Sequence, residues 1–270
     1  MKNYVALITG ASSGLGVVFA RQLAAQGYDL ILVARREERL AALAAELQQR
    51  HSNGVEVMAA DLSRPADVER VADHITGLEA LDMLVNNAGF GTTGRFVEVD
   101  LAKTMDMIQV HVTASVRLCR AALPGMLARR RGALINVASV AAFTPVPGNA
   151  TYAATKGYLV TFSKALHAEV AETGVKVQAL CPGFTYTEFH DRPELESFKR
   201  SQIPAFMWMS AEDVVATSLK ALERNQTICI PGFKYRLMAA VARSPLASLI
   251  QPIWRIVRKR LPSGSGLAHE

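Results

Sequence analysis

A doubly wound α/β fold, with helices on both faces of a parallel sheet, is predicted for this chain of 270 residues. Short apolar runs alternate with helix-length segments up to about residue 230, and this order is typical of βαβ units. The runs are apolar throughout, so the sheet should be covered on both faces. Polar and glycine-containing turns follow most runs, and in such sheets ligands bind beyond the carboxyl ends of the strands.

The N-terminal half accounts for four strands and their connections. Apolar runs of strand length span residues 4–9, 29–34, 55–59 and 81–85. A helix over 17–26 follows the first run and should end at Gly27, a residue type that suits a helix C-terminus. Alanine and leucine recur at helical spacing over 36–50. Pro65 suits the first turn of the third helix, where its missing N–H is not needed.

The C-terminal half supplies three further strands, predicted over residues 133–138, 175–180 and 227–230. A long helical segment over 101–130 precedes them, with an interruption expected at Pro124 and Gly125. The helix that carries Tyr152 should run to about residue 173, and a last helix spans 211–224.

Composition and charge narrow the classes of protein. Half of the residues are apolar and a fifth are charged, as in soluble globular proteins. Three dispersed cysteines, Cys119, Cys181 and Cys229, argue against a disulfide framework or a metal site and favour a reducing cytoplasm. Prolines interrupt the uncharged stretch 133–155, so no transmembrane segment is predicted. The net charge of +6 resides in residues 231–270, so the rest of the chain has no basic excess for nucleic acid.

A glycine-rich turn, Gly10-Ala-Ser-Ser-Gly14-Leu-Gly16, joins the first strand to the first helix. Such a turn lets the backbone approach a pyrophosphate, which the helix N-terminus then stabilises. A flexible turn without a ligand is the alternative. No Lys-Ser/Thr pair follows the turn, which excludes a P-loop phosphate transferase.

Two arginines, Arg35 and Arg36, follow the second strand. A dinucleotide fold specific for NAD has an acidic side chain at this place, to hold the ribose hydroxyls. Guanidinium groups would instead pair with the 2′-phosphate of NADP. NADP(H) is therefore favoured over NAD(H), and a solvated pair of arginines at a helix start is the alternative.

Tyr152 and Lys156 are four residues apart on a predicted helix and so project from one face. An ammonium group beside a phenol favours the phenolate and lowers the pKa of the tyrosine toward the working pH. Ser139 follows the strand over 133–138 and should lie close to the start of this helix. Such a proton donor suits the reversible reduction of a carbonyl group. For Tyr-x-x-x-Lys taken alone, an exposed amphipathic pair is the alternative.

Taken together, these motifs resemble the short-chain dehydrogenase/reductase (SDR) family over about residues 4–231. The residues that carry the resemblance, in the family's order, are Thr9-Gly10-x-x-x-Gly14-x-Gly16, Asp61, Asn86-Asn87-Ala88-Gly89, Ser139, Tyr152-x-x-x-Lys156 and Pro182-Gly183 to Thr187. The resemblance implies a single-domain Rossmann fold over residues 1–231, a seven-stranded sheet, a nicotinamide dinucleotide, and a homodimer or homotetramer.

The resemblance also implies roles for single residues. Tyr152 would be the catalytic acid/base, Lys156 would lower its pKa and hold the nicotinamide ribose, and Ser139 would hydrogen-bond the substrate carbonyl. The other expected cofactor contacts are Gly10, Ser12, Ser13, Gly14, Leu15, Gly16, Arg35, Arg36, Asp61, Leu62, Asn87, Ala88, Gly89, Pro182, Gly183, Thr185 and Thr187. No metal is expected.

His111 departs from the family pattern, which generally has a catalytic asparagine at this place. In the family that asparagine helps to hold a water through which the lysine exchanges protons with solvent. His111 could hold such a water or titrate near neutrality itself, and is therefore a catalytic candidate. A packed histidine without a chemical role is the alternative.

Residues 184–209 occupy the place of the family's mobile substrate lid. Their aromatic and methionine side chains would suit a bulky apolar carbonyl or alcohol. Residues 232–270 form a basic, amphipathic C-terminal extension, with a helix expected from Ser244-Pro245. Three roles are open for it: packing on the body or a second subunit, peripheral contact with an anionic membrane, or docking of an acidic carrier domain.

The function predicted from the sequence is an NADP(H)-dependent oxidoreductase that interconverts a hydrophobic ketone or aldehyde and its alcohol. One alternative is a catalytically impaired NADP(H)-binding protein, with His111 marking the loss. The other is an acyl-carrier-linked 3-ketoacyl reductase. A cytoplasmic location, with peripheral membrane contact through the extension, is expected.

Overall fold

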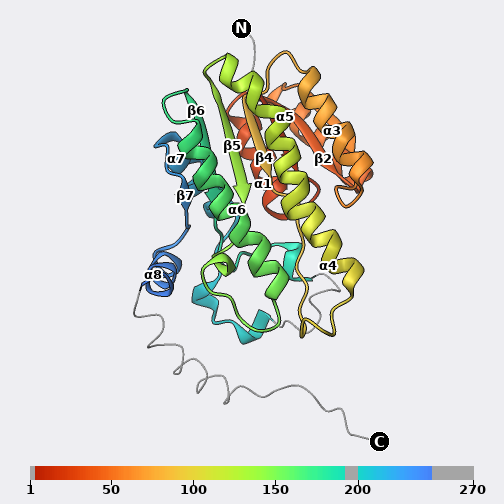
Figure 1. Cartoon of the computed structure of the whole chain (residues 1–270). Helices are drawn as coiled ribbons and strands as arrows, with labels where there is room; N and C mark the ends of the chain where they lie inside the picture. The colour runs from red at the N-terminus through yellow and green to blue at the C-terminus, as the bar shows by residue number, and fades with distance from the viewer. Residues whose placement is uncertain (1–3, 192–199, 245–270) are drawn as a thin grey trace, which may run out of the picture.

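The seven apolar runs form one parallel sheet in the computed structural model of the chain, which describes residues 4–191 and 200–244 (Figure 1). The strand order is β3-β2-β1-β4-β5-β6-β7. The strands are β1 (Tyr4–Thr9), β2 (Tyr28–Ala34), β3 (Val55–Ala59), β4 (Met83–Asn86), β5 (Gly132–Val137), β6 (Val175–Leu180) and β7 (Ile228–Cys229). The order reverses at β1, which lies between β2 and β4, and such a reversal opens a crevice at the carboxyl edge.

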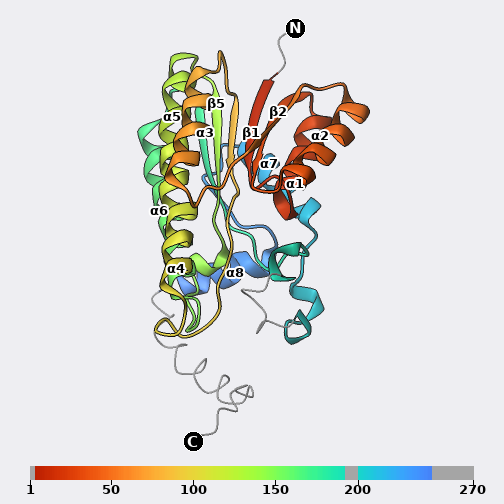
Figure 2. The ribbon, with the colours of Figure 1, turned by 90° about the vertical axis from the view of Figure 1, so that its right-hand side faces the viewer.

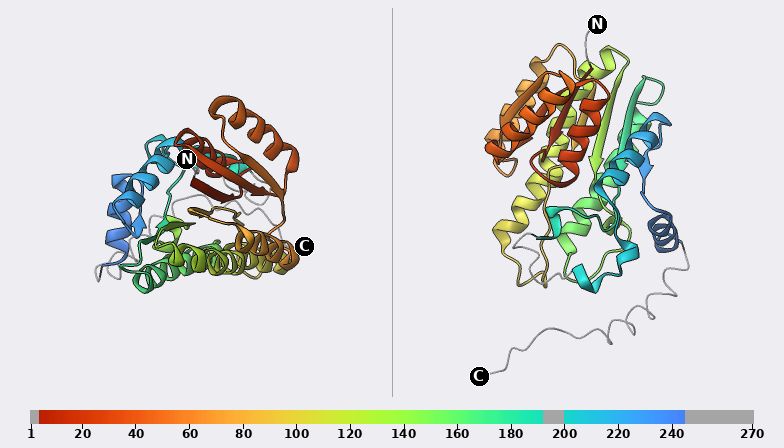
Figure 3. Two further views of the ribbon diagram at one scale, coloured as in Figure 1. Left: turned by 90° about the horizontal axis from the view of Figure 1, so that it is seen from above. Right: turned by 180° about the vertical axis from the view of Figure 1, so that it is seen from behind.

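Helices cover both faces of the sheet, as the edge-on view in Figure 2 and the view from above in Figure 3 show. One layer holds α3 (Pro65–Gly77), α5 (Ala114–Ala128) and α6 (Ala150–Glu169), with α4 (Leu101–Ile108) extending it beyond the carboxyl edge. The other layer holds α1 (Gly14–Ala25), α2 (Glu37–His51) and α7 (Ala211–Glu223). The predicted doubly wound Rossmann architecture with seven strands is therefore confirmed.

Apolar cores fill the spaces between the sheet and its helix layers, and the two largest lie on opposite faces. Successive residues of β1 point to opposite faces, so Ile8 joins the core under α1 and Leu7 joins the core under α5. Phe19 and Leu118 are among the fully buried side chains of these two cores. Full burial of a side chain of this size stabilises the fold by roughly 1.5–3 kcal/mol.

The helix interruption predicted at Pro124 is wrong. Pro124 lies inside α5, which continues to Ala128. A proline in a helix interior costs about 3 kcal/mol or more, but α5 buries Leu118, Cys119 and Met126 against the sheet, and this burial exceeds the cost. The α-helical pattern changes instead at a π-helical turn, Gln109–Thr113, between α4 and α5.

A helix that the sequence did not reveal, α8 (Phe233–Ala242), begins at the proposed C-terminal extension. Gly232 starts it with a φ of 81°, in the left-handed region that favours glycine. The helix lies at the carboxyl edge of the sheet (Figure 1). The helix expected from Ser244-Pro245 begins at the border of the described residues, and 245–270 lie outside them.

Candidate active site

The predicted glycine turn lies at the wall of a cavity of about 1950 Å³ at the carboxyl edge of the sheet. Gly10 and Gly14 have φ values of 67° and 56°, so other residue types would be strained there. A Cβ on Gly16 would lie 2.3 Å from the carbonyl oxygen of Gly10, so only glycine fits this close turn. Helix α1 begins at Gly14 and directs its N-terminus at the cavity. This cradle fits a pyrophosphate group.

The Asn87-Ala88-Gly89 turn after β4 is fastened to the glycine turn. The side chain of Asn87 donates to the carbonyl oxygens of Thr9 (2.9 Å) and Gly10 (3.3 Å). The Thr9 hydroxyl oxygen accepts from the backbone N–H groups of Asn87 (2.9 Å) and Ala88 (3.0 Å). Strand ends 78 residues apart in sequence are thereby held as one rigid wall of the cavity.

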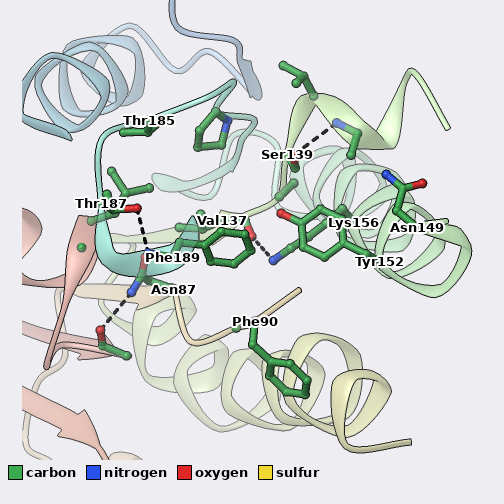
Figure 4. A pocket seen from close by; sticks show the side chains of 18 of the residues that line it. Asn87, Phe90, Val137, Ser139, Asn149, Tyr152, Lys156, Thr185, Thr187 and Phe189 are labelled. Atoms are coloured by element: carbon green, nitrogen blue, oxygen red, sulfur yellow. Dashed lines mark hydrogen bonds between the residues drawn. The ribbon is translucent and has the colours of Figure 1, made fainter. Parts of the chain in front are cut away.

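Ser139, Tyr152 and Lys156 meet in the same cavity, as predicted from the sequence (Figure 4). Ser139 caps the short 3₁₀ turn η2 (Val140–Ala142), and its hydroxyl oxygen accepts from the N–H of Ala141 at 3.1 Å. Tyr152 and Lys156 project from α6, and the Nζ of Lys156 lies 5.7 Å from the centre of the Tyr152 ring. Lys156 is buried and donates to the carbonyl oxygen of Val137 at 2.8 Å.

The sequence predicts that Lys156 lowers the pKa of Tyr152, and in the structure the pKa of Tyr152 is raised instead. Burial raises the pKa of Tyr152, and the nearby Ser139 hydroxyl only partly offsets this effect. Burial also lowers the pKa of Lys156 to about 7, so its charge is incomplete at neutral pH. Its Nζ donates to Val137 rather than to the phenol. Tyr152 therefore stays protonated near neutrality, which is the form that donates a proton to a carbonyl oxygen.

His111 lies in the π-helical turn and is 1% exposed. Its Nε2 accepts from the N–H of Phe90 at 3.1 Å, so the ring proton belongs on Nδ1, 2.9 Å from the Thr155 hydroxyl. Thr155 in turn donates to the carbonyl oxygen of Tyr152 at 2.9 Å. Burial and the charge of Lys156 hold the pKa of His111 well below its usual value. The ring is therefore neutral, which favours the packing alternative over titration near neutrality.

The predicted adenosine contacts Arg35, Arg36, Asp61 and Leu62 line the same cavity. The guanidinium group of Arg36 donates to the hydroxyl of Ser12 and to its carbonyl oxygen, each at 3.2 Å. Asp61 accepts from the N–H (3.1 Å) and the hydroxyl (2.9 Å) of Ser63, which fixes its carboxylate at the end of β3. The Arg36 contacts tie the predicted ribose-phosphate side to the glycine turn.

Almost all predicted site residues line the one cavity. The residues from the other segments that line it are Ser13, Leu15, Pro182, Gly183, Thr185 and Thr187. Gly16 and His111 do not line it. Gly16 allows the chain to pack closely against Gly10 within the turn. His111 packs against Gly89, and a Cβ on Gly89 would lie 2.7 Å from the His111 Nε2.

Sequence reasoning missed the contribution of α8. Tyr235 is buried, accepts from the N–H of Phe184 at 3.0 Å, and donates to the carbonyl oxygen of Met207. It thus fastens both ends of the predicted lid region, while Leu237 and Met238 of the same helix line the cavity. Glycine at position 183 is the only local signal, because a Cβ there would lie 2.1 Å from the Tyr235 ring.

Two features of the site indicate a class of protein. A glycine turn that fits a pyrophosphate and a tyrosine beside a serine hydroxyl line one cavity, as in oxidoreductases that use a dinucleotide. A family model for the short chain dehydrogenases matches residues 4–196. The chain belongs to this family, whose members act on CH–OH and C=O groups with a nicotinamide dinucleotide.

Individual relatives support the same assignment. A very-long-chain 3-oxoacyl-CoA reductase of Anas platyrhynchos is 33% identical over 210 residues, which cover 73% of this chain and 67% of the relative. A short-chain dehydrogenase from Sphingobium yanoikuyae, solved in complex with NADPH, has a TM-score of 0.80 at 30% identity and covers 99% of both chains. A bulky-bulky ketone specific alcohol dehydrogenase from Comamonas testosteroni has a TM-score of 0.77 at 26% identity, covering 99% of this chain and 98% of that one.

A metal site and a membrane-spanning helix each have requirements that can be compared with the described residues. Within residues 4–191 and 200–244, no group of three or more His, Cys, Asp or Glu side chains could hold a metal ion. In the same part of the chain, none of the helices combines the length and the apolarity that a bilayer crossing requires.

Proposed function

We propose that the protein is an NADP(H)-dependent oxidoreductase that interconverts a bulky, hydrophobic ketone or aldehyde and its alcohol. The observation that carries this proposal is the shared cavity, which is lined by the glycine turn, by Tyr152 and by a set of apolar side chains, the apolar compartment. The compartment wall is formed by Phe143, Phe184, Phe189, Ile203, Met207, Leu237 and Met238. An apolar wall of this kind would suit the apolar substituents of a bulky carbonyl compound.

The chain's own residues would do the positioning and the proton transfer. When bound, the nicotinamide dinucleotide supplies or accepts the hydride. Ser139 would hydrogen-bond the carbonyl oxygen, and Tyr152 would donate its proton to that oxygen as the alcohol forms. Lys156 would hold the ribose, and its pKa of about 7 allows it to exchange protons near neutrality. Proton transfer would thus take place between Ser139, which follows β5 and caps η2, and the groups of α6.

A panel of ketones, aldehydes and secondary alcohols of increasing size, assayed with NADPH or NADP⁺, tests this proposal. Turnover should increase as both substituents of the carbonyl become larger and more apolar. A folded protein that binds NADPH but reduces no member of the panel would favour the alternative of a catalytically impaired binding protein.

The preference for NADP(H) over NAD(H) belongs to the same proposal and depends on Arg35 and Arg36. Replacing Arg35 by aspartate should shift the ratio of the Kd values for NADPH and NADH by about tenfold or more toward NADH, since hydrogen bonds to charged groups contribute about 1.5–3 kcal/mol. Arg50→Asp is a control, because Arg50 is exposed near the far end of α2. An unchanged ratio in Arg35→Asp would overturn the assignment of the 2′-phosphate site.

A second candidate function is the reduction of a 3-oxoacyl group carried as a thioester. Lys234, Arg236 and Arg243 are exposed on or next to α8, beside the cavity wall that Leu237 forms. Cations at the mouth of an apolar cavity would suit an acyl chain attached to an anionic carrier. The double substitution Lys234→Gln/Arg236→Gln should then reduce kcat/KM for a carrier-bound substrate and leave that for a free β-keto ester unchanged. Equal effects on both substrates would exclude the carrier.

Assembly and location are parts of the proposal. A homodimer or homotetramer is expected from the family, and light scattering would measure it. A cytoplasmic location accords with the three cysteines, which are buried and free. Contact of residues 232–270 with an anionic membrane is proposed from their charge, although 245–270 lie outside the described residues. Deleting 245–270 should weaken pelleting with anionic vesicles, and unchanged pelleting would remove this contact from the proposal.

A further inference from the structure

Glu188, which follows β6 in the substrate-side segment, contacts two arginines at the start of α2. Its carboxylate accepts from the guanidinium group of Arg39 at 2.8 and 3.0 Å and lies 3.5 Å from that of Arg36. Arg36 is at the same time hydrogen-bonded to Ser12 of the glycine turn. One carboxylate therefore occupies a point that two guanidinium groups share at the edge of the cofactor cavity.

The residues on either side of Glu188 span the cavity. Thr187 packs on the glycine turn, where a Cβ on Gly14 would lie 3.2 Å from the Thr187 Cβ. Phe189 lies beside the candidate proton donor, with its ring centre 6.1 Å from that of Tyr152 (Figure 4). Segment 187–189 thus runs from the phosphate end of the cavity to the reacting end, and Glu188 fastens it to α2.

We propose that Arg39 is a third arginine of the 2′-phosphate site and that Glu188 is the built-in competitor of that phosphate. This inference rests on the proposed use of NADP(H). A phosphate dianion at the point between Arg36 and Arg39 replaces the carboxylate and releases segment 187–189 from α2. NAD(H) has no group that can make this replacement. Selection between the two cofactors is therefore coupled to the freedom of the segment that carries Phe189.

The ion pair between Arg39 and Glu188 is weak enough for a phosphate to replace the carboxylate. The side chains of Arg39 and Glu188 are 51% and 55% exposed, and exposed ion pairs change an equilibrium constant by about fivefold at most. A phosphate with about −1.5 to −2 charge and three acceptor oxygens binds the two guanidinium groups more strongly than a carboxylate with a single charge and two oxygens. The carboxylate therefore lowers the affinity for the phosphate without preventing its binding.

Calorimetric binding of 2′,5′-ADP and of 5′-AMP to the full chain tests the proposal, because the two probes differ only in the 2′-phosphate. Glu188→Gln should lower the Kd for 2′,5′-ADP by about two- to fivefold and leave the Kd for 5′-AMP unchanged. Glu38→Gln is the matched control: it removes one negative charge from the same turn of α2 that carries Arg39. An equal gain in Glu38→Gln would show a general charge effect and overturn the competitor role of Glu188.

A double-mutant cycle separates the contact from its surroundings. Arg39→Gln should raise the Kd for 2′,5′-ADP by about tenfold and leave the Kd for 5′-AMP unchanged. On this background Glu188→Gln should improve binding by less, because the two hydrogen bonds from Arg39 are gone and only the longer contact with Arg36 remains. An undiminished gain from Glu188→Gln would overturn the proposal.

The same measurements distinguish the inference from the proposed function. If wild-type protein binds 2′,5′-ADP no better than 5′-AMP, the NADP(H) preference itself is wrong. If it binds 2′,5′-ADP more tightly and Glu188→Gln changes nothing, the preference stands and only the competitor role of Glu188 is wrong.

Discussion

Tyr152 is the proposed general acid, and its protonation state bears on the direction of the proposed reaction. Burial raises the pKa of its phenol, so the cofactor-free protein holds the proton that reduction of a carbonyl consumes. Tyr152→Phe should reduce turnover by about 10²–10⁴-fold, the usual contribution of a positioned general acid, while the Kd for NADPH stays within about twofold. Tyr158→Phe is the matched control, since Tyr158 lies on the same helix, is 42% exposed and stacks on Phe162. Steady-state kinetics and NADPH fluorescence would measure both effects, and an active Tyr152→Phe variant would contradict the assigned acid.

Lys156 makes the stability of the fold depend on pH. Its pKa falls from 10.5 to about 7 on folding because the ammonium group is buried. Between these values the unfolded chain binds more protons than the folded protein, so the free energy of unfolding increases as the pH rises from about 7 to 10.5. Below about 7 both states are protonated, and the folded state carries the full cost of the buried charge.

Lys156→Met should therefore be stabilised relative to wild type most strongly at neutral pH, and the difference should decrease as the pH rises. Loss of the hydrogen bond to Val137 shifts the difference by a constant amount and leaves its pH dependence intact. Urea unfolding at several pH values would measure it. Lys164→Met, at an exposed position of the same helix, should show no such dependence. A difference between wild type and Lys156→Met that does not change with pH would mean that Lys156 is charged in the fold.

At the scale of the element, the π-helical turn Gln109–Thr113 places a neutral imidazole between two segments. His111→Ala removes the acceptor of the Phe90 N–H and the partner of Thr155, and should cost about 1–3 kcal/mol of stability. Because the pKa of His111 is depressed by burial, the unfolded state gains the proton first as the pH falls below the usual value near 6.5. The variant should therefore lose less stability than wild type on acidification. Its pH–rate profile near neutrality should be unchanged; an altered profile would restore the relay hypothesis.

Tyr235 connects α8 to the substrate-side segment and should act on substrate binding rather than on chemistry. Tyr235→Phe leaves the Phe184 N–H and the Met207 carbonyl without this partner. The apolar ring still packs on Gly183, so the fold should survive with a loss of about 1–3 kcal/mol. KM for a bulky ketone should rise several-fold while kcat changes little. Tyr186→Phe, at a half-exposed ring stacked on Trp208, is the control. A fall in kcat with unchanged KM would contradict a positioning role.

Local patterns predicted the elements, and long-range contacts account for what they missed. Apolar runs and the glycine turn determine β1 and α1 within a few residues, because strand formation and tight turns depend on neighbouring residue types. The contact between Arg39 and Glu188 joins residues 149 apart, and no local pattern specifies such a pair. Tyr235 is likewise 51 residues from Phe184. The pKa of Tyr152 was predicted in the wrong direction because its dominant cause, burial, depends on the assembled cavity.

At the scale of the whole molecule, the candidate cofactor cavity is lined by segments from both helix layers and from both halves of the sheet. Residues that line it come from the first strand turn, from α6 and from α8, which is close to the end of the described chain. A ligand that contacts all of these segments can bind only the folded protein, and it stabilises the fold in proportion to its affinity. Thermal unfolding with added nucleotide therefore measures the assembled site.

Saturation with NADPH at about 100 times its Kd should stabilise the protein by about 2.7 kcal/mol and raise Tm by roughly 5–10 °C, since 1 kcal/mol corresponds to about 2–4 °C in a chain of this size. The same concentration of NADH should raise Tm by less, because it lacks the 2′-phosphate that Arg35 and Arg36 are proposed to bind. In Arg35→Asp the two shifts should become similar or change order. Equal shifts for both nucleotides in the wild-type protein would show that the arginines after β2 do not bind the 2′-phosphate. The proposed preference for NADP(H) would then be wrong.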